Sequence, residues 1–172
     1  MDLNYHEAIP TDFSDSSRVW IYQSNRLFNT HKALQIKGML EEFVLSWKSH
    51  GETVKGYATL LFGHFIILMA DETSTGVSGC STDSSVRIIK EIENQFSVSL
   101  FDRQTLAFVI KDKIDLIPFA QLNQVAEHNQ IDPGTLYFNN LVLTKSELLQ
   151  NWIIPIKESW LAKRVSFRQL TA

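Results

Sequence analysis

The feature that constrains the fold most is the uncharged stretch from Tyr57 to Ala70, a mostly apolar run that Gly63 and His64 interrupt. A membrane-spanning helix needs about 18 or more consecutive apolar residues, so this stretch is too short and is broken near its centre. Glycine readily adopts the positive φ that tight hairpin turns require. We therefore predict two strands, Val54 to Phe62 and Phe65 to Ala70, joined by a two-residue connection at Gly63-His64.

Periodic segments surround this hairpin. Arg18 to Gln23 alternates as a strand does, and from Thr30 apolar residues recur every three or four positions until Gly51 ends the pattern. This spacing is typical of a helix that Thr30 caps. A second helix is expected from about Thr82, with one apolar face formed by Val86, Ile89, Ile92 and Phe96. Strand, helix, hairpin and helix in this order are typical of a ferredoxin-like split β-α-β unit.

The second half of the chain adds another hairpin, Thr105 to Ile110 and Lys113 to Ile117, around Lys111-Asp112. A helix from Pro118 to His128, a strand near Leu136 to Phe138 and C-terminal helical turns follow, with a capping box at Thr144-Lys-Ser-Glu147. Residues 1–16 show no apolar period and predict a polar N-terminal arm. We expect an α+β fold with one domain over residues 17–172. It would have a largely antiparallel sheet, a ferredoxin-like N-terminal portion, and an appended C-terminal hairpin and helices.

Composition narrows the class of protein. The chain has 172 residues, 44% of them hydrophobic, and a formal net charge of −3, which excludes collagen-like, disordered and polycationic classes. A general nucleic-acid-binding protein would carry the opposite charge, so we expect no nucleic-acid partner. The single cysteine, Cys80, cannot form a disulfide within the chain, and Met1 to Glu7 lacks the basic and apolar segments of a secretory signal. We therefore expect a cytoplasmic protein without a membrane span.

Several motifs for common chemistry are absent from the sequence. The chain has no Gly-x-x-x-x-Gly-Lys-Ser/Thr phosphate loop, no Gly-x-Gly-x-x-Gly after a strand, no His-Glu-x-x-His and no cysteine pair for zinc. No two of the five histidines share a metal-ligand spacing within one element. We therefore expect no metal and no cofactor, and neither tight binding nor hydrolysis of ATP.

The segment from Val77 to Ser85 is a loop of small residues that leads Cys80 onto the first turn of a helix. A helix N-terminus favours a thiolate, although the carboxylate of Asp83 in the same turn offsets this effect. In the predicted sheet this loop lies beside Lys48, Ser49 and His50, whereas His64 lies at the opposite end. His50 is then the base for a Cys80 nucleophile, and Asp71 is the nearest group that could orient the imidazole.

Other interpretations of the same loop stay open. Gly79 would supply the turn, Ser81 or Thr82 the helix cap and Asp83 a charge that complements the helix end, which leaves Cys80 as a small buried residue. The set Gly79, Ser81, Thr82 and Asp83 could instead bind a ligand without covalent chemistry. In the catalytic alternative, the N–H groups of Ser81 and Thr82 would stabilise an oxyanion. His50 could equally be a solvated residue before Gly51.

A set of short segments spread along the chain resembles a known family. They are Ser17-Arg-Val-Trp-Ile-Tyr-Gln23, Ser49-His-Gly51, Phe65-Ile-Ile-Leu68, Asp71-Glu72, Gly79-Cys-Ser-Thr-Asp-Ser-Ser85, Leu100-Phe-Asp-Arg103, Phe138-Asn-Asn140 and Trp152-Ile-Ile-Pro155 through Ser159-Trp160. The chain is similar over nearly its whole length to a small family of uncharacterised bacterial proteins with a Gly-Cys-Ser-x-Asp-x-Ser motif. Its members often carry the label of ABC transporter ATPase. The chain has neither the phosphate loop nor the Leu-Ser-Gly-Gly-Gln signature which that label requires. The resemblance implies a single-domain protein and supplies no catalytic residues.

These observations favour a non-catalytic cytosolic module that binds a small molecule or a partner chain at the Gly79 to Ser85 end. The first alternative is a thiol-dependent enzyme with Cys80 as nucleophile and His50 as base. The second alternative is an accessory of a transport complex that does not itself hydrolyse ATP.

Overall fold

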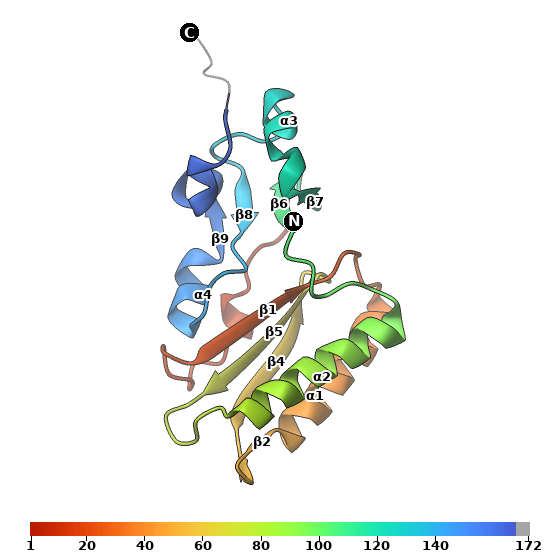
Figure 1. The fold of residues 1–172 in the computed structure, drawn as a ribbon, viewed down its shortest axis with the longest axis vertical. Coiled ribbons are helices and arrows are strands. Elements are labelled where there is room, and N and C mark those ends of the chain that lie inside the picture. The colour runs from red at the N-terminus through yellow and green to blue at the C-terminus, as the bar shows by residue number, and fades with distance from the viewer. Residues whose placement is uncertain (168–172) are drawn as a thin grey trace. The chain divides into compact units, whose positions relative to one another are not determined.

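A computed structural model describes residues 1–167 of the chain (Figure 1). These residues form two compact units. The larger unit comprises Asp2–Phe101 and Asn140–Leu149, and the smaller unit comprises Met1, Asp102–Asn139 and the described residues from Gln150 to 167. Helices and antiparallel sheets occur in the same chain, which confirms the α+β class. The prediction of one domain over residues 17–172 stays a prediction.

The sheet of the larger unit consists of β1 (Arg18–Gln23), β4 (Lys55–Leu61) and β5 (Phe65–Asp71), in the order β1-β5-β4. Both outer strands are antiparallel to β5, so they run parallel to each other on either side of it. All of β5 is buried, which explains its unbroken apolar sequence. The connection between β4 and β5 has three residues rather than the predicted two, because Leu61 pairs with Phe65 and both Phe62 and Gly63 have a positive φ.

Two long helices, α1 (Thr30–Ser46) and α2 (Gly79–Phe96), cover one face of this sheet (Figure 1). Their apolar stripes form a core with the side chains of β5 that point to the same face, namely Ile36, Leu40, Phe43, Ile89, Ile92, Ile66 and Leu68. The connectivity β1, α1, β4 with β5 between the strands is a split β-α-β arrangement, as expected. A complete ferredoxin-like fold stays a prediction.

The residues that cap the two helices differ from the predicted ones, because other side chains near each helix start form the capping hydrogen bonds. Asn29, not Thr30, caps α1, because its side chain accepts a hydrogen bond from the N–H of Lys32 at 2.9 Å. Ser78 caps α2 and forms a reciprocal capping box with Ser81, so the helix begins at Gly79 rather than near Thr82. The predicted cap at Ser81 or Thr82 is therefore wrong.

The first helix also ends earlier than Gly51. Trp47 follows α1 in an extended conformation, and β2 (Lys48–Ser49) pairs with β3 (Glu52–Thr53) across a turn at His50 and Gly51. Both turn residues have a positive φ, 52° and 86°, which is typical of a two-residue turn between antiparallel strands. Val54 connects this pair of short strands to β4, and its N–H donates to the Trp47 carbonyl at 3.0 Å.

The N-terminal arm, residues 1–16, is more closely packed than its polar sequence suggests. Tyr5 and Ile9 are buried, and the Tyr5 hydroxyl donates to the Leu148 carbonyl at 2.6 Å. Lys145, which is also buried, donates from Nζ to the carbonyl oxygens of Phe13 (2.6 Å) and Thr11 (3.4 Å). Satisfied backbone carbonyls and buried apolar side chains hold this segment in place.

The smaller unit is built on a second antiparallel sheet. Its strands are β6 (Thr105–Ile110), β7 (Lys113–Pro118), β8 (Leu136–Phe138) and β9 (Ile153–Pro155), in the order β7-β6-β8-β9. Lys111 and Asp112 both have a positive φ, which is typical of the two-residue turn predicted between β6 and β7. A core of Phe108, Ile117, Leu122, Ile131, Tyr137, Ile156 and Leu161 lies against this sheet.

Short helices complete the chain. The predicted helix from Pro118 to His128 is a 3₁₀ turn, Phe119–Gln121, followed by α3 (Leu122–Glu127). The last α-helix, α4 (Lys145–Asn151), follows Thr144, whose hydroxyl accepts from the Glu147 N–H at 3.2 Å, as the capping box predicts. Within residues 1–167 no helix has the length and apolar character needed to cross a membrane.

Gly56 of β4 offers a sharp test of packing in the larger unit. A Cβ at this position would lie 2.6 Å from Cε3 of Trp47, a ring that is itself buried and cannot move aside. We expect Gly56→Ala to lower the free energy of unfolding by about 1–3 kcal/mol, as overpacked cores do. Gly38→Ala is the matched control: nothing lies within 4 Å of a Cβ there, so the change inside α1 should stabilise by roughly 0.5–1 kcal/mol. Urea unfolding of both variants measures this, and equal stabilities would contradict the packing described.

Candidate functional site

Cys80 lies in the first turn of α2 and is exposed. The buried stripe of α2 passes through Ser81, Ser85, Ile88, Ile92 and Phe96, so the residue before Ser81 points away from the core. The alternative in which Cys80 is a small buried residue is therefore wrong. Cys80 is exposed because α2 begins at Gly79, and this start determines which residues of the first turn face the core.

The structure brings the Cys80 loop to β2 but does not pair the thiol with a base. Ser49 Oγ donates to the Gly76 carbonyl at 2.7 Å and accepts from the Ser78 N–H at 3.2 Å, so β2 and the loop are in contact as predicted. The next residue, His50, is exposed and stands in the left-handed turn. No hydrogen bond joins the Cys80 thiol to His50 in the described part of the chain.

The N–H groups assigned to an oxyanion site are already engaged. The Ser81 N–H donates to Ser78 Oγ at 3.3 Å, and the Thr82 N–H donates to the Ser78 carbonyl at 3.0 Å. Ser81 is buried and its carbonyl accepts from Trp47 Nε1 at 2.9 Å. Gly79 and Asp83 are exposed at the start of the helix. These contacts explain how the loop is held, and they leave the Ser81 and Thr82 N–H groups with no role toward a substrate.

Asp71 has partners other than His50. Its Oδ1 accepts from the Thr73 hydroxyl at 2.8 Å and the Thr73 N–H at 3.1 Å, and its Oδ2 accepts from the Ser14 N–H at 3.1 Å and Lys55 Nζ at 3.2 Å. The Thr73 hydroxyl bond holds the pKa of Asp71 well below its usual range. Burial opposes this shift, while the two N–H groups and Lys55 add to it. Asp71 thus anchors the N-terminal arm to the sheet, which is a structural role.

We expect Cys80 to react as an accessible thiol whose rate His50 does not control. Iodoacetamide should alkylate native protein at a rate within about threefold of the urea-unfolded chain, because exposure sets access. His50→Ala should leave that rate unchanged, since no hydrogen bond links the two residues. Mass spectrometry against time at about pH 7.5 measures both rates, near conditions where a free thiol is partly ionised. A native rate far below the unfolded one, or a clear loss in His50→Ala, would contradict this geometry.

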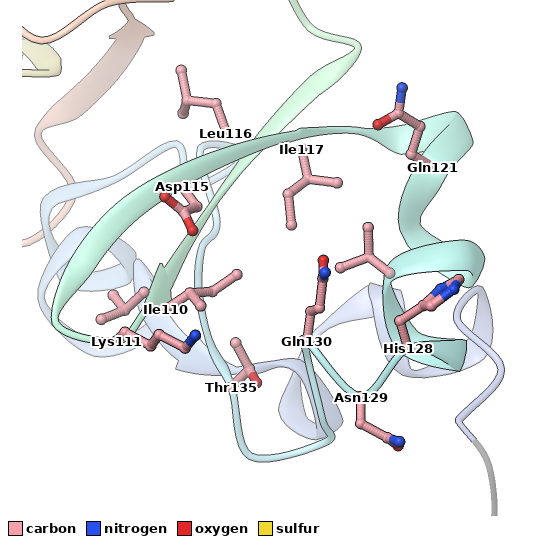
Figure 2. Close-up of a pocket in the computed structure, with 12 residues that line it drawn as sticks. Ile110, Lys111, Asp115, Leu116, Ile117, Gln121, His128, Asn129, Gln130 and Thr135 are labelled. Carbon is pink, nitrogen blue, oxygen red and sulfur yellow. The ribbon is translucent and has the colours of Figure 1, made fainter.

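The smaller unit contains a pocket of about 800 Å³ that sequence reasoning did not identify (Figure 2). The β6–β7 hairpin, α3 and the segment from His128 to Thr135 surround it. The chain leaves α3 through Asn129, which has a positive φ of 55°, and the Gln130 N–H donates to the Val125 carbonyl at 3.1 Å. Buried Ile131 then returns the chain to the core. This tight exit from α3 turns the Gln130 side chain back over the hairpin.

The pocket combines an aliphatic floor with polar groups at its edges. Ile110, Ile117 and Val125 contribute the apolar surface, and Figure 2 shows the Gln130 side chain extending toward Ile117. The side-chain amides of Gln121, Asn129 and Gln130 have no hydrogen-bond partner among residues 1–167. Polar atoms make up most of the open surface of the pocket, so its composition suits a ligand with several polar or charged groups beside a smaller apolar part.

His128 lies on the α3 side of the same pocket. Its Nδ1 is 2.7 Å from the Gln124 carbonyl oxygen, which can only accept, so Nδ1 carries a proton in this contact. The other ring nitrogen, Nε2, is then available to form a hydrogen bond with water or a ligand. The imidazole is therefore fixed to α3 while it borders the pocket.

A second hollow, of about 460 Å³, lies between α1 and α2 in the larger unit. Met39, Phe43 and Ile88 supply its apolar part, and Glu42, Arg87 and Glu91 supply charges of both signs. Ser84 lines it as well, and its hydroxyl donates to the Cys80 carbonyl at 2.9 Å. This hollow is a smaller groove along two packed helices.

Metal ligands do not gather in the described ranges: residues 1–167 hold no group of three or more His, Cys, Asp or Glu side chains able to bind an ion. No family model, no curated protein and no solved structure matches the chain. The resemblance to the bacterial family with the Gly-Cys-Ser-x-Asp-x-Ser motif therefore stays a prediction.

Proposed function

We propose that this protein is a non-catalytic binding module that holds a small molecule in the pocket of the smaller unit. The observation that carries the proposal is the meeting of an aliphatic floor with amide side chains that have no internal partner. These amides are exposed, so a ligand that covers the apolar surface can replace their contacts with water by hydrogen bonds at its edge. The proposal moves the expected binding site from the Gly79 to Ser85 loop to this pocket.

The contacts around Cys80 support a binding role over thiol chemistry. A nucleophilic cysteine needs a base within hydrogen-bond reach and free donors for the developing oxyanion. Here the thiol has no such base among the described residues, and the two candidate donors bond to Ser78. A thiol-dependent enzyme is the second candidate, because Cys80 is exposed. The alkylation rates of the native protein and of His50→Ala distinguish the two.

We also propose that the protein is cytoplasmic and that it belongs to the bacterial family with the Gly-Cys-Ser-x-Asp-x-Ser motif. The lone exposed thiol of Cys80 supports a reducing compartment, because such thiols persist where disulfides do not form.

A blocking variant with a matched control tests the binding proposal. Gln130→Phe should fill the pocket, whereas Gln124→Phe places the same side chain on exposed α3 outside the lining residues. Calorimetric titration of the full chain with neutral, anionic, cationic and zwitterionic metabolite-sized compounds should detect binding of at least one class. We expect Gln130→Phe to weaken that binding at least tenfold and Gln124→Phe to leave it intact. Absence of binding by all four classes, or binding that Gln130→Phe leaves unchanged, would contradict the proposal.

A further inference from the structure

The β7 residue Asp115 stands on an unexpected face of its strand. It pairs across the sheet with Phe108, and paired residues of neighbouring antiparallel strands point to the same face. Phe108 is fully buried in the core of the smaller unit, and so is most of Ile117, which stands on the same face of β7. Asp115 therefore directs a carboxylate to the core side of the hairpin. It is nevertheless exposed, because the pocket opens at that point.

A cation borders the same end of the pocket. Lys111, in the turn after β6, lines the pocket together with Asp115, and Figure 2 shows both on the hairpin side. Neither side chain takes part in an ion pair within 4.0 Å in residues 1–167; the pairs there join Met1 to Asp112, Arg18 to Glu72, and Lys55 to Asp12 and Asp71. The two charged side chains thus border one pocket, and neither forms an ion pair with the other or with another described residue.

This pattern selects for a ligand with charges of both signs. An anion would be attracted by Lys111 and repelled by Asp115, and a cation would experience the reverse. A ligand whose ammonium and carboxylate groups are held together meets both protein charges favourably. The aliphatic floor of Ile110, Ile117 and Val125 then suits an apolar extension from that head.

We infer that the pocket binds the zwitterionic form of an α-amino acid with a large, uncharged side chain. The ligand carboxylate lies toward Lys111 Nζ, its ammonium group toward Asp115, and its side chain over Ile117 and Val125. Gln130, which extends across the pocket, supplies an amide for the remaining polar atoms. This inference rests on the proposed function, since it names the ligand class of the same pocket.

L-Phenylalanine and two analogues, each lacking one charge, test the inference by calorimetry on the full chain. 3-Phenylpropanoate lacks the ammonium group and 2-phenylethylamine lacks the carboxylate, while both keep the ring. We expect L-phenylalanine to bind and each analogue to bind at least fivefold more weakly. Lys111→Met and Asp115→Asn should each weaken L-phenylalanine at least fivefold. The matched controls Lys157→Met and Glu127→Gln change the same charges at exposed residues outside the lining and should have no effect.

The possible failures separate the inference from the proposed function. Equal affinity for all three compounds, or full affinity in Lys111→Met or Asp115→Asn, would overturn the zwitterion assignment. Failure of L-phenylalanine to bind, while another class binds and Gln130→Phe removes that binding, would also overturn it and leave the pocket as a binding site. If no compound class binds, both the inference and the proposed function fail.

Discussion

Replacing Trp47 by alanine should lower the free energy of unfolding by about 3–5 kcal/mol, the range for deletion of a large buried aromatic side chain. Trp47 is 1% exposed and joins three parts of the larger unit. Its ring centroid lies 4.9 Å from that of Phe43 and 6.1 Å from that of Trp20, and its Nε1 donates to the Ser81 carbonyl. The deletion would leave a cavity beside β4 and would remove the hydrogen bond that ties α1's C-terminal end to the first turn of α2.

Two further variants separate packing from hydrogen bonding at this position. Trp47→Phe keeps much of the ring and loses the Nε1 bond, so we expect a smaller loss of roughly 1–3 kcal/mol. Leu45→Ala, at a side chain that is 83% exposed, is the control and should change stability by less than about 0.5 kcal/mol. Urea unfolding followed by circular dichroism avoids the loss of tryptophan fluorescence. A loss below about 1 kcal/mol in Trp47→Ala would place the ring on the surface.

Removal of the Asp71 carboxylate should be the second most damaging change, with a loss of about 3 kcal/mol in Asp71→Ala. Asp71 is 2% exposed and accepts four hydrogen bonds, so its loss leaves the N–H groups of Ser14 and Thr73 without their acceptor. Lys55 would keep Asp12 as its only carboxylate partner in the described residues. Asp12→Ala is the control: its side chain is 72% exposed, and exposed ion pairs contribute at most about 1 kcal/mol.

The same carboxylate should give the protein a specific acid sensitivity. The pKa of Asp71 is depressed in the folded state, so the unfolded chain binds more protons as pH falls below the ordinary Asp value of about 4. The stabilisation by Asp71 is therefore complete above that value and is lost as pH falls toward the folded pKa. Asp71→Asn should show a shallower decline in stability between about pH 5 and pH 2.5 than the wild-type chain. Parallel declines would contradict the account of this carboxylate.

Elements with their own periodic signal were predictable from sequence. Strand β1 and the hairpin of β6 and β7 occur where alternation and the Lys111-Asp112 turn place them. Helix starts were less predictable, because Ser78, Ser81 and Thr82 are all good capping residues. The reciprocal capping box between Ser78 and Ser81 makes Ser78 the cap of α2. The N-terminal arm gave no signal either. Tyr5 and Ile9 are isolated apolar residues that become buried only in the folded larger unit.

The candidate sites were likewise predictable from sequence only in part. Topology correctly placed the Cys80 loop against Ser49, yet the exposure of Cys80 depends on where α2 begins, which the local sequence left open. The pocket of the smaller unit could not be read from any single segment. Its floor comes from a hairpin and α3, and its amides come from short turns, so neither a periodicity nor a motif marks it.

Chemical-shift mapping of the nitrogen-15-labelled full chain with acetamide and 2-propanol tests the central claim most directly. Small organic probes collect where an apolar surface and unpaired hydrogen-bonding groups coincide. We expect the largest shifts at the backbone amides of residues 109–117 and 121–135, which contain the lining of the pocket. Gln130→Phe should remove these shifts, whereas Gln124→Phe should retain them. Shifts that concentrate at residues 77–85, or that scatter evenly over the chain, would contradict the assignment of the binding site to the smaller unit.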